Sequence, residues 1–156
     1  MTVFVVRHAD AKSRASWSHP DATRPLTRKG LSQADALVDL LHKHPIVRVL
    51  SSPSVRCVDT VTPLARKLGY KVEKSDALQE GADPAVAYAL MQTVAHDHGD
   101  AVLCTHGDLV PELLRLPSRD GLVVTDAPRW PKGSTWAIEV DGKRFTTAKY
   151  LPPPEA

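Results

Sequence analysis

Two arginines, two histidines and one glutamate together supply the groups that move a phosphoryl group: Arg7, His8, Arg56, Glu80 and His106. Guanidinium groups bind phosphate oxygens in pairs. A neutral imidazole can attack phosphorus when a hydrogen bond holds its other ring nitrogen. A carboxyl group of raised pKa can protonate the leaving group. Because arginines and a cationic histidine can neutralise the phosphoryl charge, this chemistry implies no metal and no cofactor.

Most of these side chains follow predicted strands at the point where each strand ends. Arg7 and His8 come directly after the first apolar run. Arg56 lies in the first helical turn after the second run, His106 ends a later run, and Glu80 comes from a loop. Ligands of open α/β sheets bind beyond the carboxyl ends of the strands, so we expect all five residues at one rim. The apolar runs cover residues 2–6, 46–52 and 101–106.

Strands that alternate with helices predict an α/β fold, a three-layer αβα sandwich around a mostly parallel sheet. Apolar residues at helical spacing predict the faces that pack on the sheet. The expected helix signals are Thr27, Ser52 with Pro53, and Asp83 with Pro84 at N-termini, and Gly69 at a C-terminus. The expected core faces include Leu31, Ala34, Leu37, Val38 and Leu41 in one helix, and Val86, Leu90, Met91 and Val94 in another.

The length of 156 residues suits one domain with a single core. We expect this domain to span residues 1–151 and residues 152–156 to form a loose tail. Turn-forming residues predict a long loop over 13–25 and an irregular flap over 117–133. The last strands are expected to form a hairpin that closes at Asp141-Gly142.

Apolar residues make up 42% of the chain and charged residues 24%, which is typical of a globular protein. The first residues contain no long apolar run, so we expect no signal peptide, no membrane span and a cytoplasmic location. Cys57 and Cys104 lie in apolar runs and are expected to be buried, reduced thiols.

Positive charge is concentrated near the N-terminus. Residues 7–30 hold six basic and two acidic side chains, which suits an anionic ligand such as a phosphate. Lys12, Arg14 and Arg24 are therefore candidate substrate contacts, although solvated surface charges give the same pattern. The expected partner is a small phosphorylated substrate or a phosphorylated protein, and not a nucleic acid polymer or a membrane.

Several motifs in order resemble those of the histidine phosphatase superfamily. They are "VVRHADA", "RPLTRKG", "LSSPSVRCVDTV", "LQEG" and "LCTHGD", and they cover about residues 3–116. The resemblance implies that His8 is the nucleophile and becomes phosphohistidine, that Arg7, Arg56 and His106 hold the phosphoryl group, and that Glu80 donates the proton. The first motif is usually Arg-His-Gly, and Ala9 replaces its glycine here.

Two groups of small members are similar to this chain. One is the SixA-type protein phosphohistidine phosphatases. The other is the phosphatase domain fused to Nudix domains in MutT-type nucleotide-sanitising hydrolases, and "SRDG" and "KGSTW" extend that similarity to about residue 140. Arg14 stands where mutase-like members have an asparagine, which argues against a mutase.

Three functions follow from these similarities. The first is removal of the terminal phosphate from a nucleoside diphosphate, including 8-oxo-guanosine forms. The alternatives are a SixA-like protein phosphohistidine phosphatase and a non-catalytic phosphate-binding module. Extra arginines and aromatic residues at the mouth of the site would favour the first, and an open, shallow rim the second.

Overall fold

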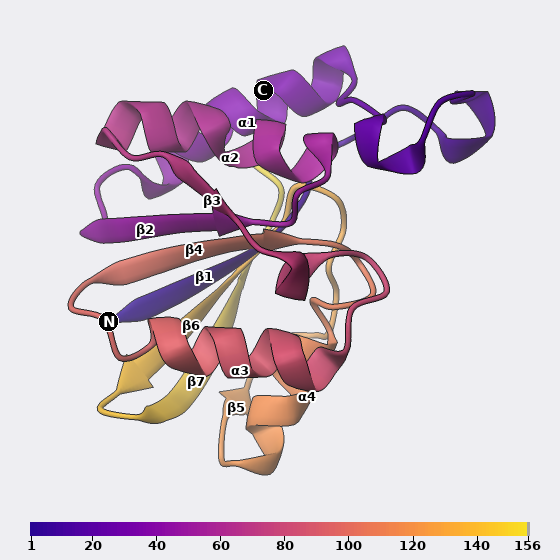
Figure 1. The fold of residues 1–156 in the computed structure, drawn as a ribbon. Helices are drawn as coiled ribbons and strands as arrows, with labels where there is room; N and C mark the ends of the chain where they lie inside the picture. The colour runs from indigo at the N-terminus through magenta and orange to yellow at the C-terminus, as the bar shows by residue number, and fades with distance from the viewer. Residues whose placement is uncertain (156) are drawn as a thin grey trace.

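A seven-stranded sheet forms the centre of the protein, in a computed structural model that describes residues 1–155 (Figure 1). The strand order is β3-β2-β4-β1-β6-β7-β5. Neighbouring strands pair in parallel except around β6, which is antiparallel to both β1 and β7. The strands are β1 Thr2–Arg7, β2 Ile46–Ser51, β3 Val72–Lys74, β4 Asp100–Thr105, β5 Val123–Val124, β6 Thr135–Asp141 and β7 Arg144–Leu151.

Helices cover both faces of this sheet, so the predicted three-layer αβα sandwich with a mostly parallel sheet is confirmed (Figure 1). Two helices lie on one face and two on the other. The first pair is α1 Arg28–Leu41 and α2 Val55–Leu68, and the second is α3 Pro84–Val94 and α4 Glu112–Arg119. None of the helices within residues 1–155 is both long and apolar enough to cross a lipid bilayer.

Strand β1 lies inside the sheet and is buried on both faces, which explains its unbroken apolar sequence. Val3 and Val5 pack into the core beneath α3 and α4, whereas Phe4 and Val6 pack into the core beneath α1 and α2. This alternation follows from the two-residue period of a strand. The first strand is thereby fixed from both sides directly before the Arg7-His8 pair.

Helix starts confirm two of the three predicted caps. The Thr27 side chain accepts a hydrogen bond from the Gly30 amide, and Asp83 caps α3 with Pro84 as the first helical residue. The third cap was placed wrongly, because α2 begins at Val55 after Ser54. The Ser52 amide still donates to the Cys104 carbonyl oxygen of the sheet, and the Ser52 hydroxyl forms a hydrogen bond with His106. Gly69 ends α2 in the left-handed conformation, with φ of 81°.

The predicted core faces are wrong at two positions, because Leu31 and Val86 are exposed. Leu31 lies beyond the edge of the buried stripe of α1, and Ala87 points inward in place of Val86. The chain between 13 and 25 is also more ordered than a plain loop. It contains the short 3-10 helices η1 Arg14–Ser16 and η2 Asp21–Thr23, and a third, η3 Asp76–Leu78, follows β3.

The C-terminal part contains more regular structure than the predicted flap over 117–133. Helix α4 continues to Arg119, and β5 pairs with β7. The hairpin turn lies one residue later than predicted, because Asp141 and Arg144 still pair and Gly142 starts the turn at φ of 63°. Strand β7 ends at Leu151, and residues 152–155 follow without secondary structure. The division into a domain over 1–151 and a tail over 152–156 stays a prediction, and Ala156 lies outside the described residues.

Candidate active site

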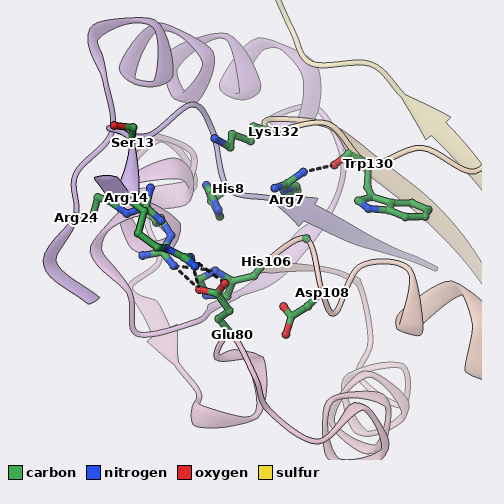
Figure 2. A pocket seen from close by; sticks show the side chains of 12 residues that line it. Arg7, His8, Ser13, Arg14, Arg24, Glu80, His106, Asp108, Trp130 and Lys132 are labelled. Carbon is green, nitrogen blue, oxygen red and sulfur yellow. Dashed lines mark hydrogen bonds and ion pairs between the residues drawn. The ribbon is translucent and has the colours of Figure 1, made fainter. Parts of the chain in front are cut away.

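A cavity of about 530 Å³ lies at the carboxyl ends of the parallel strands (Figure 2). It brings together all five residues that the sequence singled out. They come from the end of β1, the start of α2, the loop after η3 and the end of β4. The cavity is lined by Arg7, His8, Ser13, Arg14, Arg24, Arg56, Glu80, His106, Gly107, Asp108, Trp130 and Lys132.

The backbone fixes the orientation of the His8 ring. Its Nδ1 atom lies 2.8 Å from the carbonyl oxygen of Ala9, which only accepts hydrogen bonds, so Nδ1–H is the donor. In the neutral ring Nε2 therefore keeps its lone pair. Burial, followed by the charges of His106, Arg56 and Arg7, lowers the pKa of His8 to about 3 against the opposing effect of the Ala9 hydrogen bond. His8 is thus a neutral imidazole at physiological pH.

The guanidinium group of Arg7 is held at the edge of the same cavity. Its Nη1 donates to the Trp130 carbonyl oxygen at 3.0 Å, and its buried Nε has no partner among the described residues. Gly107 leaves room for this group, because a Cβ atom there would lie 2.8 Å from the Arg7 Cζ atom. Burial lowers the pKa of Arg7, and the charges of Glu80 and Asp108 oppose this.

Ser52, which the sequence predicted as a helix cap, holds the His106 ring in place. A hydrogen bond of 2.8 Å links Nε2 of His106 to the Ser52 hydroxyl. Its Nδ1 lies 3.4 Å from Nη2 of Arg56, and its ring centroid lies 5.5 Å from that of His8. The second histidine therefore lies near the His8 ring, with the second arginine next to it in the same cavity.

Two carboxylates, Asp21 and Glu80, hold three of the four arginines that line the cavity. Arg56 is buried, and its Nη2 donates to Asp21 Oδ2 and to Glu80 Oε2, both at 3.0 Å. Arg14 donates to both Glu80 oxygens at 3.0 Å and pairs with Asp21 at 3.3 Å. Arg24 donates its Nε to the same Asp21 at 2.9 Å. One aspartate on the 13–25 segment thus contacts the three arginines.

The ionisation of Glu80 differs from the sequence prediction of a carboxyl group with raised pKa. Burial by itself raises the pKa of Glu80, but the hydrogen bonds and charge of Arg14, followed by the charges of His106 and Arg56, lower it overall. In this structure Glu80 is therefore an ionised ion-pair partner of Arg56. Sequence reasoning missed this because both arginines are far from Glu80 along the chain.

The three additional basic residues predicted as substrate contacts differ in their position relative to the cavity. Arg14 and Arg24 line the cavity, whereas Lys12 does not. The Lys12 ammonium group lies 5.7 Å from the Trp17 ring centroid, on the outside of the segment. Arg24 is buried and also donates to the Lys12 carbonyl oxygen, so it braces this segment. Among the three, Arg14 is the one whose guanidinium group stands exposed at the mouth of the cavity.

The structure also adds residues that the sequence did not single out. Asp21, Ser52, Asp108, Trp130 and Lys132 bind or line the site. The position of Ser52 at a strand end and of Asp108 beside His106 was a signal that could have identified these two. Within residues 1–155, no three His, Cys, Asp or Glu side chains are grouped so as to hold a metal ion.

Sequence comparison gives two findings. A family model of the Histidine phosphatase superfamily (branch 1) matches residues 3–82. An 8-oxo-(d)GTP phosphatase of Mycolicibacterium smegmatis is 32% identical over 157 residues, which cover 99% of this chain and 49% of the relative. The chain therefore spans about half the length of this curated relative.

Solved structures share the fold at low sequence identity. The protein histidine phosphatase SixA complexed with tungstate has a TM-score of 0.77 and 21% identity, covering 99% of this chain and 97% of that one. A mycobacterial glucosyl-3-phosphoglycerate phosphatase complexed with VO3 has a TM-score of 0.74 and 15% identity, covering 99% of both chains. At this identity, the likeness shows the fold alone.

Proposed function

The chain belongs to the histidine phosphatase superfamily (branch 1), and from this premise we propose that it is a metal-independent phosphatase that forms a phosphohistidine on His8. The observation that carries the proposal is the 2.8 Å hydrogen bond from His8 Nδ1 to the Ala9 carbonyl oxygen. It leaves the Nε2 lone pair free in a cavity that Arg7, Arg56 and His106 also line. A non-catalytic phosphate-binding module would not need this neutral, oriented imidazole.

Catalysis takes place in two displacements. In the first, His8 Nε2 forms a bond to phosphorus while the bond from phosphorus to the leaving oxygen breaks, and Glu80 gives that oxygen a proton. In the second, water attacks the phosphohistidine, the Glu80 carboxylate takes the proton of the water, and the bond from phosphorus to Nε2 breaks. Inorganic phosphate leaves, and His8 and Glu80 return to their starting states. Arg7, Arg56 and His106 stabilise the phosphoryl charge throughout.

The ion pairs of Glu80 connect substrate binding to its role as the acid. The phosphoryl group competes with the carboxylate for Nη2 of Arg56, which now donates to Glu80 Oε2 at 3.0 Å. When phosphoryl oxygens take this donor, Glu80 loses a stabilising contact and gains a negative neighbour. Both changes raise the pKa of a carboxyl group. Substrate binding thereby lets Glu80 take up a proton from solvent, which converts it from an ion-pair partner into a proton donor. The proton returns to solvent when phosphate leaves and the ion pairs of Glu80 form again.

We propose a nucleoside diphosphate as the substrate, with its terminal phosphate removed. The relative from M. smegmatis supports a nucleotide substrate, because its name, 8-oxo-(d)GTP phosphatase, gives an oxidised guanosine nucleotide, although as the triphosphate. The cavity supports it through Arg14 and Lys132, which add positive charge beyond the groups around one phosphate. The alternative substrate is a phosphohistidine protein, and the test below separates the two.

The test measures phosphate release in EDTA from GDP and 8-oxo-GDP, with a phosphohistidine-bearing protein in parallel. We expect rapid release from the nucleotides by the wild type and none by His8→Ala. The variant His98→Ala removes an exposed histidine outside the cavity and should retain full activity. Release by His8→Ala would contradict the covalent mechanism. Turnover of the phosphoprotein alone would replace the nucleotide with the alternative substrate.

A further inference from the structure

The exposure of the lining residues separates a floor from a mouth in the cavity. His8, Arg56 and His106 are 4%, 1% and 2% exposed and form the floor. The side chains of Arg14 and Glu80 are 65% and 41% exposed and lie at the mouth. In an in-line displacement the leaving group departs from the side of phosphorus opposite the nucleophile. With His8 at the floor, the leaving group therefore lies at the mouth.

Lys132 is a cation at this mouth that pairs with no acidic side chain of residues 1–155. Arg14, Arg24 and Arg56 each pair with Asp21, and two of them also pair with Glu80. None of the ion pairs found among residues 1–155 includes Lys132. In Figure 2, Lys132 and Glu80 lie on opposite sides of His8. Its charge is thus available to an anionic group that passes between these two walls.

The backbone around Lys132 is tied to the nucleophile strand. The Gly133 amide donates to the carbonyl oxygens of Arg7 and His8 at 3.1 and 3.0 Å, with Gly133 at φ of 84°. The Arg7 amide donates to the Ser134 carbonyl oxygen at 3.0 Å, and the Arg7 side chain binds the Trp130 carbonyl oxygen. These contacts on both sides of Lys132 fix its Cα position relative to His8.

A second cavity, of about 750 Å³, adjoins the first at the same lysine. Lys132 lines both, so it stands at their junction. The second cavity is also lined by Lys29, Gln33 and Asp10, and by the residues after β7. Its charges are mixed, because Asp10 and Glu155 accompany the two lysines. Lys132 therefore lies where the mainly basic lining of the first cavity meets the lining of mixed charge of the second cavity.

We propose that Lys132 binds the phosphate that stays with the leaving group, so that the site holds the two phosphates of a diphosphate at once. The floor takes the phosphoryl group that moves to His8, and Lys132 takes the adjacent phosphate at the mouth. This assignment rests on the proposed function, which identifies the group that moves to His8 as a terminal phosphate. It predicts that the site binds a diphosphate more tightly than a single phosphate. A flexible ammonium group suits a phosphate whose position changes as the bond breaks.

The test is a direct binding measurement that does not depend on turnover. Isothermal titration calorimetry compares methylenediphosphonate, which cannot be hydrolysed between its phosphorus atoms, with inorganic phosphate. The proteins are the wild type, Lys132→Gln, Lys132→Arg, and Lys43→Gln as a matched control. Lys43 is an exposed lysine outside both cavities, so its variant has the same net charge as Lys132→Gln. The exposed Lys132 side chain is not part of the core, so the variants should fold normally.

We expect Lys132→Gln to weaken methylenediphosphonate binding about tenfold, equivalent to about 1.4 kcal/mol, and to change phosphate binding less than twofold. Lys132→Arg should restore most of the loss, and Lys43→Gln should bind like the wild type. Equal loss for both ligands, no loss for the diphosphonate, or equal affinity of the wild type for both ligands would each overturn the assignment. The proposed function fails separately, if the wild type binds the diphosphonate as expected but releases no phosphate from nucleoside diphosphates.

Discussion

At the scale of single residues, the hydrogen bond from His8 to the Ala9 carbonyl oxygen decides which nitrogen can react. Because the carbonyl belongs to the adjacent residue, the ring orientation depends on the local backbone and on no distant partner. The surrounding burial and positive charge then keep this imidazole neutral. The two effects keep His8 in the neutral form that its proposed role as nucleophile requires.

The low pKa of His8 predicts a specific dependence of stability on pH. Its pKa is 6.5 in its ordinary state and about 3 in the fold. Between these values the unfolded chain binds a proton that the folded chain excludes, so the free energy of unfolding falls as the pH falls below about 6.5. We expect the free energy of unfolding, measured with denaturant at pH 7.5 and pH 5, to fall by about 2 kcal/mol less in His8→Asn than in the wild type. Equal losses in the two proteins would contradict the low pKa.

The proposed role of Glu80 as proton donor depends on the leaving group. Its proton is needed when the leaving oxygen is strongly basic, and is less important for a good leaving group such as p-nitrophenolate. We expect Glu80→Gln to lower kcat about 100-fold or more for an alkyl phosphate monoester such as glycerol 2-phosphate, because its leaving alkoxide is far more basic than p-nitrophenolate or than the phosphate that leaves from a nucleoside diphosphate. The loss should be much smaller for p-nitrophenyl phosphate. Steady-state kinetics with both substrates measures the contrast, and an equal loss for both would show that Glu80 acts by positioning arginines instead.

At the scale of elements, the N-terminus of α1 packs against the chain that follows His8. The Thr27 amide donates to the Asp10 carbonyl oxygen at 3.0 Å, and Thr27 also caps α1 by accepting from the Gly30 amide. Gly30 is needed here for its size, because a Cβ atom would lie 1.9 Å from the Asp10 carbonyl oxygen. This helix end therefore supports the nucleophile segment from behind.

Replacing this glycine should reverse the usual effect of the substitution. Gly→Ala within a helix ordinarily stabilises a protein by about 1 kcal/mol. Gly30→Ala should instead lower the free energy of unfolding by about 1–3 kcal/mol, as overpacked positions do. Ser32→Ala, two residues along the same helix, is the control and should change stability by less than about 0.5 kcal/mol. Thermal and urea unfolding would measure both, and a stabilised Gly30→Ala protein would contradict the close packing.

At the scale of the whole molecule, the sheet order brings the site together. Strands β2, β4 and β1 are neighbours and parallel, so their carboxyl ends open on one rim. The adjacent strand β6 starts beside the end of β1, and the segment before it brings Trp130 and Lys132 to the same cavity. All the lining residues come from this chain of 156 residues, although it spans about half of its curated relative.

The positive charge around His8 predicts phosphatase activity without added metal. In the proposed mechanism, the arginines around His8 supply the positive charge that a divalent cation supplies in other phosphatases. We expect EDTA to change the rate of phosphate release less than twofold, and added Mg²⁺ not to increase kcat for a monoester such as p-nitrophenyl phosphate. The simple monoester avoids binding of Mg²⁺ to a nucleotide. Loss of activity in EDTA that returns with a metal would contradict the mechanism.

The sequence alone was sufficient for the fold class and for the five residues at the floor and mouth of the site. Runs of alternating or consecutive apolar residues identify the strands, and apolar residues at helical spacing identify the helices between them. Because parallel strands share one carboxyl end, the positions of Arg7, His8, Arg56 and His106 along the chain already place them together. Helix capping was also predictable at Thr27 and Asp83, because a cap depends on neighbours within a few residues along the chain.

Properties that depend on contacts between distant segments required the tertiary structure. Asp21 binds Arg56 from 35 residues away, Ser52 binds His106 from 54 residues away, and Arg14 reaches Glu80 over 66 residues. No local pattern encodes these pairings, and they decide the ionisation of Glu80 and the orientation of the second histidine. The same holds for Lys132, which the pairing of β6 with β1 places at the mouth. Sequence determined which groups are present at the rim, and tertiary packing decided which of them are already paired, because charge interactions depend on distance in space.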